Sequence, residues 1–155
     1  MSDIIHASAV ALSAKSDAKA VLLLGPSGSG KSTLAARLMD AYAAQLIGDD
    51  RIHLSVEAAK IMVAPHEKLA GLLELRGLGL LRMDYLASAP LALVVQLVEE
   101  RSHVPRLPDG HYFTHQGIDV PKLTLHGADL ATPLIISKAI TALAHGFRDD
   151  AIYPA

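Results

Sequence analysis

The residues best suited to chemistry lie in one glycine-rich segment near the start of the chain. Residues 25–32 match the pattern G-x-x-x-x-G-K-[S/T], between a run typical of a buried strand and an amphipathic helix. Glycines let several backbone N–H groups point at one anion, and a helix beginning at Lys31 adds its positive dipole end. Lys31 would reach the β- and γ-phosphates of a nucleotide, and Ser32 would ligate Mg²⁺. We therefore expect a phosphate-binding loop formed by Gly25, Pro26, Ser27, Gly28, Ser29, Gly30, Lys31, Ser32 and Thr33.

Two adjacent aspartates are the next candidates. Asp49 and Asp50 follow the short apolar stretch 45–47, where proteins with such a loop carry a metal-supporting aspartate. Neighbouring carboxylates at a strand end point in different directions, so one can lie near Mg²⁺ while the other accepts a proton from an attacking hydroxyl. The alternative is a solvated turn, because Asp is common in turns. The phosphate loop upstream favours the functional interpretation.

Two charged residues interrupt a leucine-rich stretch in the middle of the chain. Glu74 and Arg76 lie within 72–81, and because an unpaired buried charge is costly, they either pair or face a site. Side-chain chemistry alone favours a structural ion pair or the wet face of an edge strand. The histidines lack the spacing of a helical metal site. His6, on the first strand, is by itself more typical of a strand histidine than of a catalytic one.

Periodicity predicts two helices and one long loop. Apolar residues at helical spacing predict a helix from 31 to about 43, directly after the phosphate loop. A second helix is predicted to start at Thr132-Pro133, with Thr132 as N-cap, and to be stopped by Gly146. Residues 15–18 indicate a polar turn, and 102–117, rich in His, Pro and Gly, indicate a loop.

The remaining runs predict an α/β fold with a mixed sheet. Short apolar and β-branched runs predict strands at 4–12, 19–24, 45–47, 51–56, 59–63, 91–99 and 118–125. This strand content exceeds that of an alternating β-α-β chain. A simple doubly wound sheet is therefore not expected. We predict a mixed, strand-rich core with the helix of the phosphate loop packed on one side.

Length and composition narrow the class of protein. The 155 residues suit a single catalytic domain, predicted at 1–146, followed by a loose tail at 147–155. The net charge of −2, without a long Lys/Arg run, argues against nucleic acid as a partner. The absence of cysteine excludes disulfides and thiolate chemistry. The longest apolar stretch, 89–98, is too short to cross a membrane, and no secretory signal is visible, so a cytoplasmic location is expected.

Taken together, the motifs resemble those of the HPr kinase/phosphorylase family. The segment Glu74-Leu-Arg76-Gly-Leu-Gly-Leu-Leu resembles the family's signature stretch, and the loop followed by Gly-Asp49-Asp50 resembles its order of motifs. His6 corresponds to the histidine that the family carries before its phosphate loop. The likeness runs over about 4–81, and more faintly through the last helix. The chain resembles a short form that begins near the catalytic domain, without the additional N-terminal domain of long members.

The resemblance implies a function and a set of roles. Family members transfer phosphate from ATP to a serine of HPr, the small phosphocarrier of the sugar phosphotransferase system. Many reverse the reaction with inorganic phosphate, and many are hexamers. Their catalytic domain resembles the nucleotide-binding part of phosphoenolpyruvate carboxykinases. By position, Ser32, Asp50 and Glu74 would support Mg²⁺, and Asp49 would be the general base, although the two aspartates could exchange roles. His6 would lie beside the reacting phosphate, and Lys31 and Arg76 would complete the catalytic set.

Departures from the family pattern leave alternatives open. The position after Ser32, often Glu in the family, is Thr33 here. The stretch 126–129 lacks the arginine that the family links to dephosphorylation, so the reverse reaction is less expected than the kinase reaction. A nucleotide-binding regulatory module with reduced catalysis is one alternative. A small-molecule kinase is another, because the same loop serves many such enzymes.

Overall fold

The computed structural model describes residues 2–14 and 17–155, which form a large mixed sheet, a separate hairpin and two α-helices. In chain order the elements are β1 (Asp3–His6), β2 (Ser8–Ala14), β3 (Asp17–Leu24), α1 (Lys31–Tyr42), β4 (Gln45–Gly48), β5 (Arg51–Glu57), β6 (Lys60–Pro65), η1 (Glu67–Leu69), β7 (Leu72–Leu75), β8 (Gly79–Arg82), β9 (Ala89–Val98), η2 (Arg101–His103), β10 (Tyr112–His115), β11 (Ile118–His126) and α2 (Thr132–Ala142).

The large sheet brings its parallel strands together beside the phosphate loop. Its order is β1-β5-β6-β9-β3-β2-β4, and β11 joins the C-terminal part of β9 and carries β10. Strands β3, β9 and β11 run parallel, whereas β2 and β4 are antiparallel to their neighbours. The loops that follow β3, β9 and β11 therefore open at one edge of the sheet. Ligands commonly bind at such an edge in open α/β sheets.

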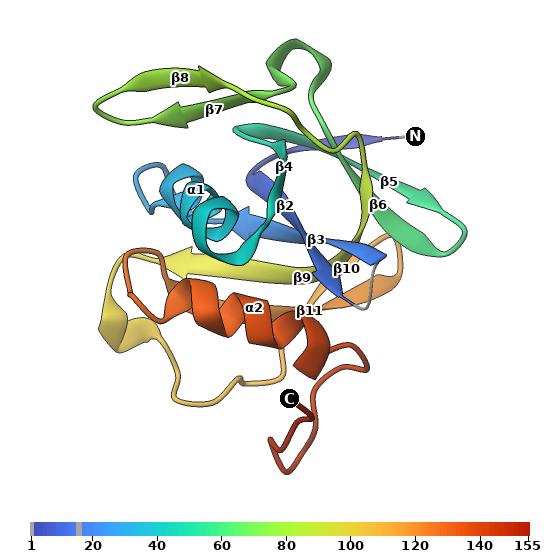
Figure 1. The fold of residues 1–155 in the computed structure, drawn as a ribbon. Coiled ribbons are helices and arrows are strands. Elements are labelled where there is room, and N and C mark those ends of the chain that lie inside the picture. Colours follow the sequence, from blue (N-terminus) through green and yellow to red (C-terminus); the bar gives the residue numbers. More distant parts are fainter. Residues whose placement is uncertain (1, 15–16) are drawn as a thin grey trace.

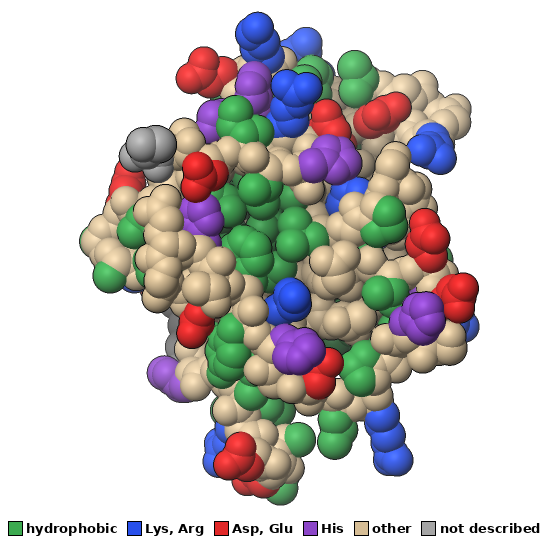
Figure 2. Space-filling model, turned by 180° about the vertical axis from the view of Figure 1, so that it is seen from behind, with side chains coloured by type: hydrophobic (Ala, Val, Ile, Leu, Met, Phe, Trp, Pro, Cys, Tyr) green, Lys and Arg blue, Asp and Glu red, His purple; other side chains and the backbone are tan. Residues whose placement is uncertain are grey.

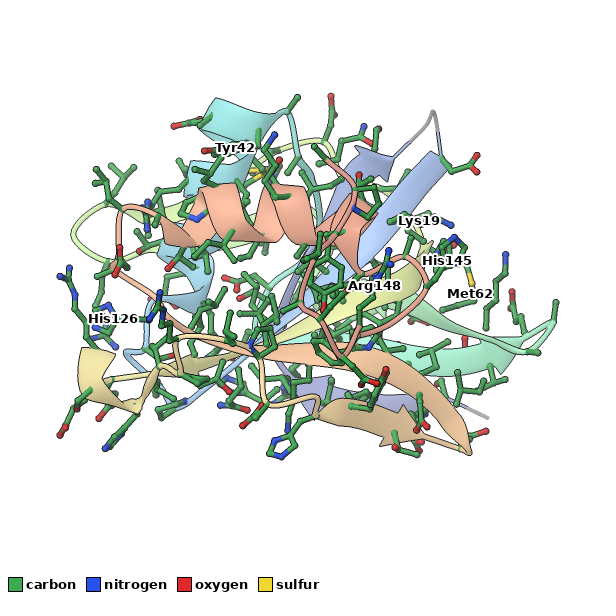
Figure 3. All side chains as sticks on the ribbon, turned by 90° about the horizontal axis from the view of Figure 1, so that it is seen from below. Lys19, Tyr42, Met62, His126, His145 and Arg148 are labelled. Atoms are coloured by element: carbon green, nitrogen blue, oxygen red, sulfur yellow. The ribbon has the colours of Figure 1, made fainter. Side chains whose placement is uncertain are left out.

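Both faces of the central strands are buried, which explains their nearly continuous apolar sequence. Side chains alternate along β3, so Val21 and Leu23 enter a core shared with α1 and α2. Ala20 and Leu22 enter a second core on the opposite face. Both helices cover the same face of the sheet (Figure 1), and a view from below shows the strands beneath α2 (Figure 3). On the back of the molecule, apolar side chains gather at the centre, within a rim of histidines and charged residues (Figure 2).

The first predicted strand, 4–12, is in fact two strands. The chain changes partners at Ala7: β1 pairs with β5, whereas β2 pairs with β3 and β4. The Ala7 N–H donates to the carbonyl of Asp50 at 3.1 Å, which satisfies the backbone at the crossing. Of the predicted turn 15–18, residues 15 and 16 lie outside the described residues, and Asp17 and Ala18 already belong to β3.

The other corrections fall in the second half of the chain. The predicted loop 102–117 contains strand β10, which pairs with β11 through a tight turn at Gln116-Gly117, where both φ angles are positive. Thr132 is not the N-cap of α2: Ala131 has that position, and the Thr132 hydroxyl donates to the His126 carbonyl at 2.6 Å. Helix α2 ends at Ala142, before the expected stop at Gly146.

Other predicted elements agree with the structure within a few residues. The predicted helix from 31 to about 43 is α1, and the predicted strands at 19–24, 45–47, 51–56, 59–63, 91–99 and 118–125 are β3, β4, β5, β6, β9 and β11. No strand was predicted in the leucine-rich stretch, which forms the hairpin β7–β8 above α1 (Figure 1). In the predicted tail, Phe147 and Tyr153 pack against the first core.

Candidate active site

The phosphate loop joins β3 to α1 and takes a shape that side chains would obstruct. Gly30 is the N-cap of α1 and has a left-handed φ of 96°. A Cβ at Gly25 would lie 2.6 Å from the Ser29 hydroxyl and 3.0 Å from the Leu97 carbonyl. The Ser29 N–H donates back to the Pro26 carbonyl at 3.0 Å, closing the turn. The loop is therefore a concave backbone cradle at a helix N-terminus, which suits a phosphate group.

Lys31 lies inside this cradle. Its side chain is buried, and its ammonium donates to the carbonyls of Gly25 at 2.7 Å and Pro26 at 3.0 Å. Burial lowers the pKa of Lys31 below its ordinary 10.5 because it disfavours the charged form, while the charges of Asp49 and Asp50 act in the opposite direction. The two carbonyls thus hold the Lys31 ammonium inside the loop, where a bound phosphate would contact it.

The lowered pKa of Lys31 predicts how nucleotide binding depends on pH. ATP affinity is expected to fall as pH rises through this pKa, below 10.5, because a neutral amine no longer attracts phosphate. In the same window the unfolded chain holds more protons, so the free energy of unfolding should rise with pH from this group. Calorimetric titration of ATP from neutral to alkaline pH tests the first effect, and proton uptake on binding should accompany it. An affinity that does not change as pH rises to 10.5 would contradict this role of Lys31.

Asp49 is the hub of the site. Its buried carboxylate accepts from Ser32 Oγ, which lies 2.9 Å from both oxygens, and from Ser8 Oγ at 2.5 Å. The backbone N–H of Glu74 adds a third donor at 3.2 Å. Donors from β2, β7 and α1 thereby fix one orientation of the carboxylate beside the loop serine. This is the arrangement in which an aspartate supports a metal held by that serine.

Ser8 is a functional residue that sequence reasoning missed. It is fully buried on β2, and no motif marks it; only the pairing of β2 with β4 brings it to Asp49. We expect Ser8→Ala to leave Asp49 short of one donor and to lower catalytic turnover about tenfold, with little change in folding. Ser8→Thr, which keeps the hydroxyl, should recover most of the turnover. Equal losses in both variants would show that packing, and not the hydrogen bond, is what matters.

Asp50 has different surroundings from its neighbour. It is exposed and has a left-handed φ of 68°, which turns its side chain away from Asp49 and toward β1. There its Oδ1 lies 2.7 Å from Nε2 of His6, and both side chains are more than half exposed. The pair faces solvent, where an incoming hydroxyl could approach. The two aspartates therefore have different partners: Asp49 is hydrogen-bonded to Ser32, and Asp50 is hydrogen-bonded to His6.

A cleft of about 200 Å³ collects nearly all of the predicted site residues. It is lined by His6, Ser27, Gly28, Gly30, Lys31, Ser32, Thr33, Asp49, Asp50, Glu74 and Arg76. Glu74 and Arg76 come from the hairpin β7–β8 and are exposed residues that line the cleft. Of the two interpretations that chemistry alone favoured, the structural ion pair between them is not formed, whereas the exposure of both residues agrees with a solvated strand face. Gly25, Pro26 and Ser29 do not line the cleft; their backbone shapes the loop from beneath.

A second overlooked feature supports the loop from behind. Gly127, just after β11, packs so closely that a Cβ there would collide with the Ser29 carbonyl. Arg37 of α1 holds this contact by donating to the carbonyls of Gly127 and Asp129, each at 3.0 Å. Gly127, which is 90 residues from Arg37 in sequence, thus forms a wall behind the phosphate loop and sets the position of that loop.

This wall gives a test of how closely the loop is positioned. Gly127→Ala is expected to push Ser29 and to weaken ATP binding about tenfold, since small displacements in a cradle lose several hydrogen bonds at once. Ala144→Ser is the control, because Ala144 is exposed beyond the end of α2. ATP titration of both variants makes the comparison. An ATP affinity in Gly127→Ala equal to that of the wild type would show that the backbone around residue 127 moves to accommodate the methyl group without disturbing the phosphate loop.

The donors present suit a magnesium ion held with a nucleotide. Within residues 2–14 and 17–155, no cluster of three or more His, Cys, Asp or Glu side chains could cage a metal alone. Mg²⁺ usually binds through one or two carboxylates together with substrate phosphates and water. The Ser32 hydroxyl and the Asp49 carboxylate, side by side, match that need.

Comparison with known proteins identifies the family. The family model described as HPr Serine kinase C-terminal domain matches residues 5–144. The chain belongs to this family. The resemblance predicted from Glu74, Arg76 and the phosphate loop is thereby confirmed. In the described residues, no helix is long and apolar enough to cross a membrane.

Two known proteins are similar to the chain. The HPr kinase/phosphorylase of Mycoplasma mycoides subsp. mycoides is 40% identical over 88 residues, which cover 51% of this chain. The match spans only 27% of the length of that relative. The structure of the Hpr(Ser) kinase/phosphatase from Coxiella burnetii superposes with a TM-score of 0.74 at 23% identity, covering 89% of this chain and 93% of that one. This likeness confirms the predicted mixed α/β fold.

Proposed function

We propose that the chain is an ATP- and Mg²⁺-dependent serine kinase that phosphorylates HPr or a related phosphocarrier protein. The observation that carries this proposal is the meeting, in one cleft, of a phosphate cradle, a Ser32–Asp49 contact and an exposed His6–Asp50 pair. Those are the parts that phosphoryl transfer needs: positioning, charge neutralisation and a base. Family membership points to HPr as the acceptor.

We propose that the two aspartates have the opposite roles to those first expected from the resemblance. Asp49 would support the metal, because Ser32 and two other donors hold it beside the loop. Asp50 would be the general base, because it faces solvent and is hydrogen-bonded to His6. Ser32 and Asp49 would hold Mg²⁺, which would offset negative charge on the nucleotide phosphates. Glu74 lies at the rim of the cleft, from which it can orient water around the metal.

The transfer step then follows from the positions of these residues. Asp50 takes the proton of the acceptor serine as its oxygen forms a bond to the γ-phosphorus, and ADP leaves with the electrons of the broken P–O bond. His6 holds the Asp50 carboxylate and can share the proton. Lys31 and Arg76 offset negative charge on the phosphates, since the Arg76 Nη1 atom lies only 4.0 Å from where a Cβ of Gly28 would be.

Incubation of the purified protein with ATP, Mg²⁺ and HPr tests the function. The control is HPr whose acceptor serine is replaced by alanine. Mass spectrometry should find one phosphoryl group on the wild-type carrier and none on the variant. An unmodified carrier, with ATP binding intact, would contradict the kinase proposal and favour a regulatory module or another acceptor.

Several finer properties complete the proposal. Because residues 126–129 lack the arginine associated with the reverse reaction, we propose weak phosphorolysis of phosphorylated HPr by inorganic phosphate. We also propose that residues 1–146 act as one catalytic domain, that the protein works in the cytoplasm, where a phosphocarrier acts, and that it assembles into a homo-oligomer, as the hexamers of the family suggest.

A further inference from the structure

The topology of the sheet shows where the nucleoside half of ATP must leave the cleft. The phosphate loop follows β3, which lies between β2 on one side and β9 on the other. The groups proposed to handle the transferred phosphate, Asp49 and Asp50, follow β4 on the β2 side. A nucleotide threaded through the loop therefore carries its base toward the ends of β9 and β11, which run parallel to β3.

The segments at that end form a shelf next to the phosphate loop. We define the nucleoside shelf as the loop 127–131 after β11 together with η2 after β9. Figure 1 shows both at the same edge of the molecule as the phosphate loop, on the side away from the hairpin β7–β8. Figure 3 shows His126, the last residue of β11, beside η2. The shelf is continuous with the cradle, because Gly127 packs against Ser29.

The shelf is held firmly although it lies at the surface. Arg37 donates to the carbonyls of both Gly127 and Asp129. The Asp129 Oδ1 atom accepts from the Ala131 N–H at 3.1 Å, and its Oδ2 lies 3.9 Å from Arg101 Nε of η2. Binding to a preformed surface avoids the entropic cost of ordering it.

One large apolar side chain on this shelf is exposed and does not contribute to the hydrophobic core. Leu130, in the loop between β11 and α2, is 88% exposed. Leu130 is the third residue after Gly127, so the Cα atoms of the two residues are within about 10 Å of each other. The Arg101 side chain, 69% exposed, lies 3.9 Å from the carboxylate of Asp129, the residue before Leu130. An apolar surface and a planar guanidinium are groups that pack against the faces of a purine ring.

We propose that the nucleoside shelf is the binding site for the base and ribose of ATP, with Leu130 packed on the base and Arg101 stacking beside it. This inference rests on the proposed function only in taking ATP as the nucleotide. It adds a site for the half of the ligand that the phosphate loop does not hold. The base is contacted by one apolar side chain and one guanidinium, so ATP and GTP should bind with similar affinity.

The test compares ATP with inorganic tripolyphosphate, which fills the phosphate cradle but has no nucleoside. Titrations with Mg²⁺ measure both dissociation constants for the wild type, Leu130→Asp and Arg101→Ala. We expect each variant to bind ATP about five- to tenfold more weakly and tripolyphosphate as tightly as the wild type. Leu107→Asp, at a leucine 60% exposed in the following loop, should change neither constant.

Two outcomes would overturn the proposal. Unchanged ATP affinity in both variants would show that the nucleoside lies elsewhere. An equal loss for ATP and tripolyphosphate would show that the substitutions act through the phosphate cradle. Failure of the kinase proposal is distinguishable, because wild-type protein that binds ATP more tightly than tripolyphosphate but leaves HPr unlabelled would contradict only the proposed reaction.

Discussion

Lys31→Met is expected to lower phosphate transfer on the order of a thousandfold. The ammonium lies inside the phosphate loop, and methionine retains its length and apolar stem but not its charge or its donors. Steady-state measurements should show most of the loss in turnover, together with weaker ATP binding. Without Lys31 the cleft would present Asp49 and Asp50 to an anionic ligand, with Arg76 still in the lining.

The same substitution should leave the fold nearly unchanged. Removing a buried ammonium relieves its desolvation, which offsets the lost hydrogen bonds to Gly25 and Pro26. We therefore expect the free energy of unfolding in urea to change by less than about 2 kcal/mol. Lys138→Met, at an exposed site on α2, is the matched control and should keep full activity. Wild-type turnover in Lys31→Met would contradict the role of the loop.

The second large effect is expected from Asp50→Asn. Asparagine tolerates the left-handed backbone at this position and can still contact His6, but it cannot accept the serine proton. Turnover should fall by about 10²–10⁴, with ATP affinity nearly unchanged. The transfer rate at saturating ATP and carrier is the measurement.

Asp49→Asn provides the comparison that assigns the two roles. Asp49 touches the loop serine, so its amide variant should need far more Mg²⁺, and high Mg²⁺ should recover part of its activity. Asp50→Asn should gain nothing from added Mg²⁺. The opposite pattern, with rescue of Asp50→Asn alone, would restore Asp49 as the base.

Features that depend on neighbouring residues could be predicted from the sequence. The phosphate loop, its strand and its helix are local, since glycine placement and apolar spacing define them within 19–43. The interrupted leucine run marks Glu74 and Arg76, but neither the hairpin that the run forms nor its orientation toward the cleft could be predicted. Strand β10 was missed inside the predicted loop 102–117, because this four-residue strand is stabilised by pairing with β11 and not by its own sequence pattern.

Features that depend on strand register could not be predicted. The antiparallel pairing of β2 with β4 brings Ser8 to Asp49, and the backbone turn at Asp50 directs the second carboxylate to His6. The sequence predicted Thr132 as a helix N-cap, but in the structure its hydroxyl donates a hydrogen bond to the His126 carbonyl. Gly127 carried no signal, because its importance comes from the backbone of Ser29, which only the fold brings near.

Transfer of the γ-phosphate to a carrier serine is the most direct test of the proposed chemistry. ATP labelled at the γ-phosphate and ATP labelled at the α-phosphate would be incubated in parallel with Mg²⁺, HPr and either the wild type or Lys31→Met. Label on HPr from γ-labelled ATP alone, with wild-type protein alone, is the expected result. No label on HPr from either nucleotide, while ATP still binds, would contradict the assignment of this cleft as a serine kinase site.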